Sequence, residues 1–381
     1  DRLNVQGNRL MTADLDGDGY PDLLVHRIGT TARTVVATAQ ADSAKWSMRI
    51  LMNRPGPDGG RTFVDATVDS GYGVLPGATT SGPELRVAHL AAAADVDNDG
   101  DLDLFSGTTP DPTADETKTP DTGDRSQILL NDGHGVFTLA PPSDVTPPLK
   151  PRLPTSGATF VDADRDGKID LFVGFWYRAY GESDFGAQAQ LYRGNGDGTF
   201  TLATEPAGLK TKATGGNKTL AEGANPRPAY GVTSCDLDDD GAPELMVSAY
   251  GRQWNLLYRN DGKGAFSEVG QPSGFAGDDN RDYTSNEFFA CYCTVHPDAV
   301  DCEGVKAPQL QCPTPADAAW RPGIDDQPWR SNGNTFSTFC GDIDGDGRND
   351  LYNAEIHHWW AGAASDSSQV LRNVSGAEGL R

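Results

Sequence analysis

One pattern recurs five times along this chain of 381 residues and constrains its fold more than any other feature. Acidic residues stand at positions 1, 3, 5 and 9 of a short loop, and glycine stands at position 6. The clearest copy runs from Asp342 to Asp350, with Gly347 at its sixth position. Alternate carboxylates in a turning backbone, with the main-chain carbonyl of position 7, supply the oxygen ligands that Ca²⁺ prefers. Glycine suits position 6 because it turns the chain sharply without steric cost.

All five copies keep the same spacing, so we expect up to five Ca²⁺ ions, one in each loop. A single loop of this kind could equally be a solvated turn, but five in register favour metal binding. The fourth copy departs furthest, because it ends on Glu244 and carries the additional Asp239. The expected ligands, with position 7 giving only its carbonyl, are Asp14, Asp16, Asp18, Tyr20 and Asp22; Asp95, Asp97, Asp99, Asp101 and Asp103; Asp162, Asp164, Asp166, Lys168 and Asp170; Asp236, Asp238, Asp240, Ala242 and Glu244; and Asp342, Asp344, Asp346, Arg348 and Asp350.

Each acidic loop lies inside a longer repeat of short apolar segments. One segment precedes the loop and a second follows it, a third ends in a turn, and a Gly-rich hairpin then leads to an aromatic residue that opens a fourth. No stretch shows a sustained helical period. Four strands in each repeat predict an all-β chain that folds as a β-propeller. Each blade carries the acidic loop between its strands one and two. The expected blades cover about residues 9–67, 87–140, 156–203, 230–269 and 335–381, and residues 267–334 form a cysteine-containing insertion.

The repeat resembles a known family. The pattern Asp-x-Asp-x-Asp-Gly-x-x-Asp-Leu, followed by Leu-Leu-x-Asn-x-Gly-x-Gly-x-Phe, resembles the FG-GAP/VCBS repeat of integrin α-subunit propellers. Phe63-Val-Asp-Ala-Thr and Asn334-Thr-Phe-Ser-Thr-Phe-Cys-Gly-Asp resemble the secreted cartilage-acidic-protein-like branch. The resemblance covers nearly the whole chain outside the insertion and implies a calcium-binding propeller. It leaves the function open, because such propellers host adhesion, lectin, scaffold and lyase activities.

The net charge of −24 is largely that of the acidic loops, since positions 1, 3, 5 and 9 of the five loops supply twenty of the 55 acidic residues. An acidic chain is not expected to bind nucleic acid. The sequence contains no long apolar run, so direct insertion into a membrane is not expected. Six cysteines, and calcium loops that need millimolar calcium, predict a secreted, periplasmic or cell-surface protein. Cys291, Cys293, Cys302 and Cys312 could bind zinc, but disulfides are favoured. Six cysteines allow 15 pairings. Cys235 and Cys340 each precede an acidic loop in consecutive blades, so a disulfide between them could join neighbouring blades.

The last blade is expected to lack its fourth strand, because only eight residues follow Asn373. Arg2–Gln6 could supply it, but only Gly7 and Asn8 separate that segment from the first strand, and about 14 Å must be crossed. We therefore expect an incomplete ring, part of a seven-bladed propeller that a second chain or fragment completes.

The connections on the face opposite the acidic loops are rich in tryptophan, tyrosine and arginine, which dominate binding hot spots and stack on sugar rings. The alternative is that these side chains pack the insertion onto the propeller, with Trp320 and Trp329 as anchors. His357 and His358 point opposite ways, so a transition-metal site with Glu355 or His296 is not favoured. We expect a site for a protein or glycan formed by Trp176, Tyr177, Arg178, Tyr250, Arg252, Trp254, His357, His358, Trp359 and Trp360.

Three classes of function remain. The favoured one is a secreted binding or adhesion module for a protein or glycan. The second is an enzyme resembling a polysaccharide lyase, with Tyr250 or His357 as base and Arg178 or Arg252 neutralising a uronate. The third is a structural scaffold. The sequence contains no nucleophile-elbow, zincin or phosphate-loop motif, which favours the non-enzymatic classes.

Overall fold

The computed structural model describes residues 9–27, 46–74, 84–109, 125–146, 153–177, 186–209, 226–330, 333–376 and 379–380. The described strands form five antiparallel sheets. The chain divides into two compact units, Asp1–Glu182 with Gln190–Thr204 and Ser183–Ala189 with Glu205–Arg381. The first unit holds three sheets and the second holds two.

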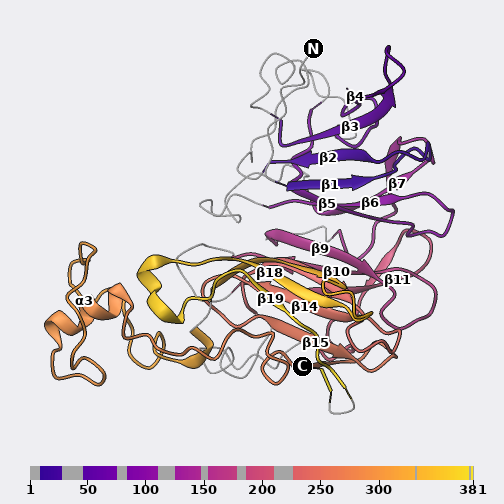
Figure 1. Ribbon diagram of the computed structural model, residues 1–381. Helices are drawn as coiled ribbons and strands as arrows, with labels where there is room; N and C mark the ends of the chain where they lie inside the picture. Colours follow the sequence, from indigo (N-terminus) through magenta and orange to yellow (C-terminus); the bar gives the residue numbers. More distant parts are fainter. Residues whose placement is uncertain are drawn as a thin grey trace. The chain divides into compact units, whose positions relative to one another are not determined.

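The three sheets of the first unit have four strands each (Figure 1). The first sheet comprises β1 (Arg9–Ala13), β2 (Asp22–His26), β3 (Met48–Pro55) and β4 (Arg61–Asp65). The second comprises β5 (Leu90–Ala94), β6 (Asp103–Gly107), β7 (Gln127–Asn131) and β8 (Phe137–Leu139). The third comprises β9 (Thr155–Val161), β10 (Asp170–Phe175), β11 (Gln190–Gly194) and β12 (Phe200–Leu202).

The second unit holds one complete and one incomplete sheet. The fourth sheet comprises β13 (Ala229–Cys235), β14 (Glu244–Ala249), β15 (Leu256–Asn260) and β16 (Phe266–Glu268). The fifth has only three strands, β17 (Asn334–Gly341), β18 (Asp350–Ile356) and β19 (Gln369–Leu371). Within the part of the chain that the structure describes, no fourth strand pairs with β19, as the sequence predicts. Residues 2–6, which could have supplied that strand, lie outside the described residues.

Every sheet is a meander in which each strand pairs with the next one along the chain. This is the strand order of a propeller blade, and the acidic loop joins strands one and two as predicted. Apolar side chains from successive sheets pack between them. Leu24 and Ile50 of the first sheet lie in one core with Leu104 and Leu129 of the second. In the second unit, Met246 and Leu257 share a core with Leu351 and Leu371.

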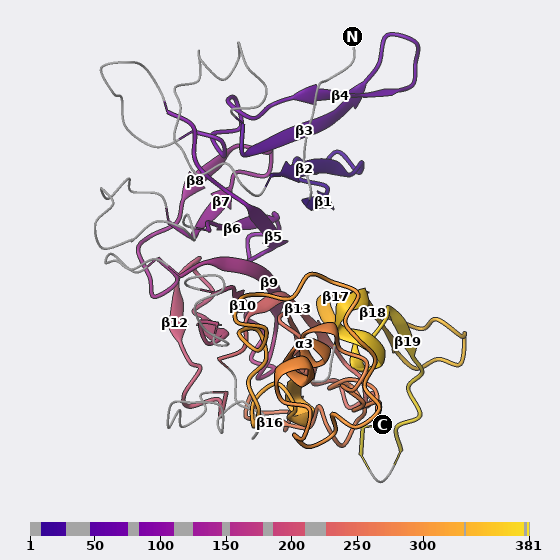
Figure 2. The same cartoon turned by 90° about the vertical axis from the view of Figure 1, so that its left-hand side faces the viewer.

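The insertion differs from the prediction, because it contains a helix, α3 (Glu287–Val295), visible in Figure 2. The Asn286 side chain caps this helix by accepting hydrogen bonds from the amides of Phe288 and Phe289. Two disulfides, Cys291–Cys312 and Cys293–Cys302, tie the helix to the segment that follows it. The disulfides correspond to the favoured prediction and exclude the zinc alternative. Two short 3₁₀ turns, Pro328–Arg330 and Trp359–Ala364, complete the unit's described helical structure.

Candidate metal centres and aromatic connections

The acidic loops bring carboxylates together at five places. We number the loops in chain order: loop one (Asp14–Asp22), loop two (Asp95–Asp103), loop three (Asp162–Asp170), loop four (Asp236–Glu244) and loop five (Asp342–Asp350). In each loop, three acidic side chains place one oxygen apiece within 4.8 Å of the others. The residues at positions 1, 3 and 5 form this group in loops one to three, and those at positions 1, 3 and 9 form it in loops four and five. Each group could hold a metal ion.

The loop backbone winds around its own carboxylates. In loop one, Asp14 accepts hydrogen bonds from the amides of Asp18 at 3.1 Å and Gly19 at 2.8 Å. Asp18 in turn accepts one from the amide of Tyr20 at 3.0 Å. The bond from the position 6 amide to the position 1 carboxylate recurs in loops two to five. The side chains at positions 1 and 5 are therefore held in place before any ion binds.

Two backbone positions in every loop have a positive φ. The glycines at position 6 have φ between 79° and 96°, which agrees with the sharp turn expected there. Position 4 is also left-handed in all five loops, and sequence reasoning missed this. It is occupied by Gly17, Asn98, Arg165, Asp239 and Gly345. Glycine, asparagine and aspartate signal such a conformation, whereas Arg165 gives no signal in the sequence.

The acidic residue at position 9 is buried and connects the loop to the third strand. Asp350 accepts hydrogen bonds from the amides of Ile343 at 3.0 Å and Asn373 at 2.8 Å. The equivalent residues make the same two kinds of bond in the other four loops. Burial raises the pKa of Asp103 to about 6 and that of Glu244 to about 7. Position 9 therefore fixes the geometry of the blade. Oδ2 of Asp350 and of Asp170 accepts a second hydrogen bond, from the Asp344 amide and from Arg193 respectively, whereas the oxygen that accepts from the third strand keeps a second lone pair.

Several loop carboxylate oxygens fit a cation because they are buried without a donor. Oδ1 of Asp97, Asp164, Asp236 and Asp238 has no hydrogen-bond partner among the described residues. A buried acceptor left unpaired is costly, especially when it is charged. A hard divalent cation would supply the missing interaction, and carboxylate oxygens are its preferred ligands.

Arginine side chains partly neutralise four of the five loops. At the end of the third strand, Arg259 lies 2.7 Å from Asp238 and Arg372 lies 2.6 Å from Asp344. Arg193 contacts loop three in the same way, and Arg54 pairs with Asp16 of loop one. Loop two has no such ion pair among the described residues. Burial, and then the charges of the neighbouring Asp99 and Asp95, raise the pKa of Asp97 in this loop.

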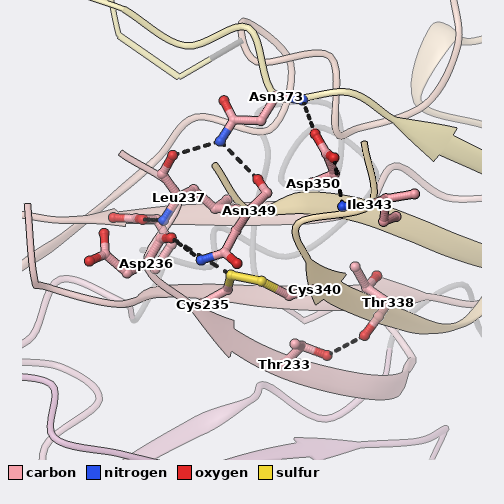
Figure 3. Close-up of a disulfide and its surroundings, with 11 residues drawn as sticks. Thr233, Cys235, Asp236, Leu237, Thr338, Cys340, Ile343, Asn349, Asp350 and Asn373 are labelled. Carbon is pink, nitrogen blue, oxygen red and sulfur yellow. Dashed lines mark hydrogen bonds between the residues drawn. A yellow bond between two sulfur atoms is a disulfide. The ribbon is translucent and has the colours of Figure 1, made fainter. Parts of the chain in front are cut away.

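Loops four and five are joined directly (Figure 3). The Cys235–Cys340 disulfide links β13 to β17, which confirms the predicted bridge between neighbouring blades. Beside it, the Thr233 hydroxyl donates to the Thr338 carbonyl at 2.8 Å, and the Asn349 amide donates to the Asp236 carbonyl at 2.9 Å. The last bond connects the two acidic loops themselves.

The residues expected on the opposite face are not all brought together. Trp176 and Tyr177 belong to the first unit, where their rings meet edge to face at 5.5 Å, and Tyr177 is buried. Arg178 lies outside the described residues. The other expected residues belong to the second unit.

Trp360 is the centre of an aromatic group in the second unit. The Arg252 guanidinium lies 5.3 Å from its ring centroid, and the His358 ring stacks on it at 4.9 Å. Phe288 of helix α3 meets the same ring edge to face at 5.2 Å. Trp359, the preceding residue, is 61% exposed. We call Arg252, His358, Trp359 and Trp360 the Trp360 cluster.

Trp254 corrects the sequence expectation, because it is buried with Ala276 and Trp329 beneath the insertion. Trp320 is also buried, in a core formed with Phe289 and two cysteines of the insertion. For these three tryptophans the packing alternative is right.

Tyr250 and His357 lie outside the Trp360 cluster. The Tyr250 ring packs edge-on against Phe336 at 5.8 Å. The His357 Nδ1 atom lies 2.5 Å from the Ser365 carbonyl oxygen. Neither His357 nor His358 belongs to a metal-capable group of the described residues. No helix among the described residues is long and apolar enough to cross a bilayer.

The meander sheets and the loops between their first two strands define a β-propeller. Residues 95–173 match the family model described as FG-GAP-like repeat, and residues 6–25 match the FG-GAP repeat. These two matches and the five meander sheets fit an FG-GAP β-propeller. No curated protein matches the chain.

Three solved structures are similar to parts of the chain. The first is an Agrocybe aegerita lectin that recognises non-reducing terminal N-acetylglucosamine, with 18% identity and a TM-score of 0.34 over 68% of this chain. The second is BBS1N in complex with ARL6DN, with 11% identity and a TM-score of 0.31 over 70% of this chain. The third is the Photorhabdus luminescens Tc holotoxin pore, with 16% identity and a TM-score of 0.22 over 68% of this chain. The matches span 64%, 57% and 12% of those chains, less than two thirds in each case.

Proposed function

We propose that the protein is a secreted, calcium-stabilised propeller that binds a protein or glycan through the Trp360 cluster. The calcium assignment is supported chiefly by the buried carboxylate oxygens of Asp97, Asp164, Asp236 and Asp238, which lack donors among the described residues. Positions 1, 3 and 5, the carbonyl of position 7 and the position 9 oxygen that accepts from the third strand would hold the ion. Bound calcium supplies positive charge that offsets the repulsion among these carboxylates.

Secretion is supported by the cysteines and by the kind of site. All six cysteines form disulfides, which persist in oxidising compartments. Exposed calcium loops of extracellular modules typically have a Kd of about 10⁻⁴–10⁻³ M, a range that suits extracellular calcium.

The Trp360 cluster is the best-supported ligand site because it combines the exposed ring of Trp359 with the ring of Trp360, which neighbouring side chains hold in place. Trp359 offers an apolar face to solvent, and Arg252 and His358 stack on Trp360 beside it. Sugars and protein loops both bind to tryptophan in such settings. Adhesion, as in integrin-like propellers, would use the same kind of surface.

A glycan array, followed by titration of the best glycan, tests this site. We expect Trp359→Ala to weaken binding by about tenfold or more, the effect of losing a hot-spot ring. The control is Val300→Ala, which removes an 82% exposed apolar side chain from the insertion. Equal binding by both variants would remove the support for the Trp360 cluster. Absence of any glycan or protein ligand would favour the scaffold class.

No observation favours a lyase over a binding module. His357 Nδ1 lies against the Ser365 carbonyl and the Tyr250 ring packs on Phe336. Incubation with uronic-acid polysaccharides, followed by absorbance of the unsaturated product, would detect that activity.

A further inference from the structure

Three acidic side chains come together in the second unit, outside the acidic loops. Glu355 is near the end of β18 that lies away from loop five, Asp366 follows the turn Trp359–Ala364, and Asp278 belongs to the insertion. The main-chain amide of Asp278 donates to Oδ2 of Asp366 at 3.3 Å. Burial, and then the charge of its neighbour Asp278, raise the pKa of Asp366, and Asp366 acts in the same way on Glu355. The three carboxylates therefore occupy one region of the unit.

Four side-chain oxygens in this region are buried and have no hydrogen-bond partner among the described residues. They are both carboxylate oxygens of Glu355, Oδ1 of Asp366 and the hydroxyl oxygen of Thr335. Asp366 is only 2% exposed, and Thr335 is fully buried. Thr335 pairs with Glu355 across β17 and β18, which places the hydroxyl beside the carboxylate. Buried acceptors without a donor are costly, most of all when they are charged, so this region calls for a cation.

Gly333 leaves room beside these oxygens. A Cβ atom at this position would lie 1.8 Å from Oε2 of Glu355 and 3.0 Å from the main-chain carbonyl oxygen of Asp366. A side chain here would therefore displace the Glu355 carboxylate, whereas glycine lets both oxygens border the same space. A main-chain carbonyl is a further ligand of the kind that Ca²⁺ accepts.

Basic side chains do not neutralise this group as they neutralise the acidic loops. The ion pairs of the described residues include none to these three carboxylates. The charge of Arg281 partly opposes the rise in the pKa of Asp366. The Arg281 guanidinium, however, donates to the main-chain carbonyl of Pro328 at 2.9 Å. The negative charge of the group is therefore left for another partner.

We propose that Glu355, Asp366 and Asp278 bind a Ca²⁺ ion in a site separate from the acidic loops. The carboxylates of Glu355 and Asp366, the Asp366 carbonyl and the Thr335 hydroxyl face the ion from inside the unit, and the exposed Asp278 lies where it enters. One divalent cation satisfies all these oxygens, whereas a shared proton, which replaces it in a chelator, satisfies only two. Unlike the loop carboxylates, these three do not place their oxygens within 4.8 Å of one another, so the site fills after the loops as calcium rises.

Calcium titration of chelator-treated variants tests the proposal. Glu355→Gln and Asp366→Asn each keep the size of the side chain and remove its charge. Glu303→Gln, on the exposed surface of the insertion, is the control because it changes the net charge equally. Bound calcium is counted by equilibrium dialysis at concentrations well above about 10⁻³ M, and at about pH 8 so that protons compete least. Circular dichroism of each variant checks that it is folded, and either of the first two variants alone is sufficient for the test.

We expect Glu355→Gln and Asp366→Asn each to bind about one ion fewer per chain than the wild type, and Glu303→Gln to bind as many as the wild type. In excess EDTA the first two variants should melt at or above the wild-type Tm, because a buried repulsive charge is gone, and calcium should raise their Tm by less. Wild-type uptake by the first two variants, or an equal loss in Glu303→Gln, would overturn the proposal. So would a lower Tm in EDTA, which would mean that protein donors already satisfy the carboxylates. The result does not depend on the acidic loops, since a chain whose loops bind no calcium would still bind this one ion.

Discussion

The side-chain amide of Asn373 donates a 2.7 Å hydrogen bond to the main-chain carbonyl of Leu237, the second residue of loop four. The same amide donates to the carbonyl of Asn349 in loop five at 2.9 Å. Asn131 repeats this arrangement in the first unit, where it joins Leu15 of loop one to Leu102 of loop two. The asparagine that ends the third strand therefore couples the acidic loop of its own blade to that of the preceding blade.

This coupling predicts that Asn373→Ala destabilises both loops. The variant leaves the buried Leu237 carbonyl and the partly buried Asn349 carbonyl without this donor, which costs about 1–3 kcal/mol. Thermal unfolding in calcium should show the loss as a lower Tm. The control is Asn53→Ala, because the Asn53 amide donates to the Pro21 carbonyl within its own loop. If both variants lower the Tm equally, the coupling between loops is not the cause.

Loop two should respond differently from loop five when its position 3 carboxylate is neutralised. Asp97→Asn relieves repulsion that no described arginine offsets, so we expect a higher Tm in EDTA and a smaller gain from calcium. Asp344→Asn removes the ion pair with Arg372, so we expect no such gain in EDTA. Melting each variant in EDTA and in calcium checks this contrast. A lower Tm in EDTA for Asp97→Asn would contradict the charge argument.

Arg259 should compete with the ion for Asp238. Removing it by Arg259→Gln should tighten calcium binding at loop four, but only modestly, because an exposed ion pair contributes about 0–1 kcal/mol. Calcium titration by calorimetry measures the change. Lys263→Gln is the matched control, since it alters the net charge equally on the neighbouring turn. An equal effect of both variants would show only a general change of charge.

Glu355 should make stability fall as pH rises. Burial, and then the charge of Asp366, raise its pKa from 4.5 to about 8. Between these two values the folded state keeps a proton that the unfolded state has lost, so stability declines as pH rises through this window. Glu355→Gln should flatten the dependence of Tm on pH from 5 to 8, and Glu303→Gln on the exposed insertion should leave it unchanged. A wild-type slope in Glu355→Gln would contradict the assignment.

Equivalent positions in the fourth and fifth sheets should tolerate truncation very differently. Met246→Ala opens a cavity in a buried core and should cost about 2–5 kcal/mol. Tyr352→Ala removes a side chain that is partly solvent-exposed in residues 1–381 and should cost less than about 1 kcal/mol. Denaturant unfolding of both variants measures the difference. Similar losses would mean that the face of Tyr352 is covered within these residues.

The sequence predicted the features that depend on local spacing. The acidic residues that alternate up to Asp350, the glycine at Gly347 and the strand on each side of the loop all depend on residues close together in the sequence. The loops and blades could therefore be located in advance. The pairing of Cys235 with Cys340 followed from their equivalent places in consecutive repeats.

Other features depend on contacts between distant residues and could not be foreseen. Helix α3 has apolar residues on several sides and is fixed by Asn286 and two disulfides, so its sequence lacks a clear helical period. The burial of Trp254 depends on Trp329, which lies in the insertion. The ion pair of Arg259 with Asp238 depends on the register between the third strand and the loop.

Calcium titration of chelator-treated protein, with melting curves recorded alongside, tests the central claim most directly. Millimolar calcium should stabilise each site by roughly 0.4–1.4 kcal/mol, or roughly 2–7 kcal/mol over five sites. We predict uptake of about five ions per chain with a Tm that rises by many degrees. No uptake, together with the same melting curve in calcium and in excess EDTA, would contradict the account.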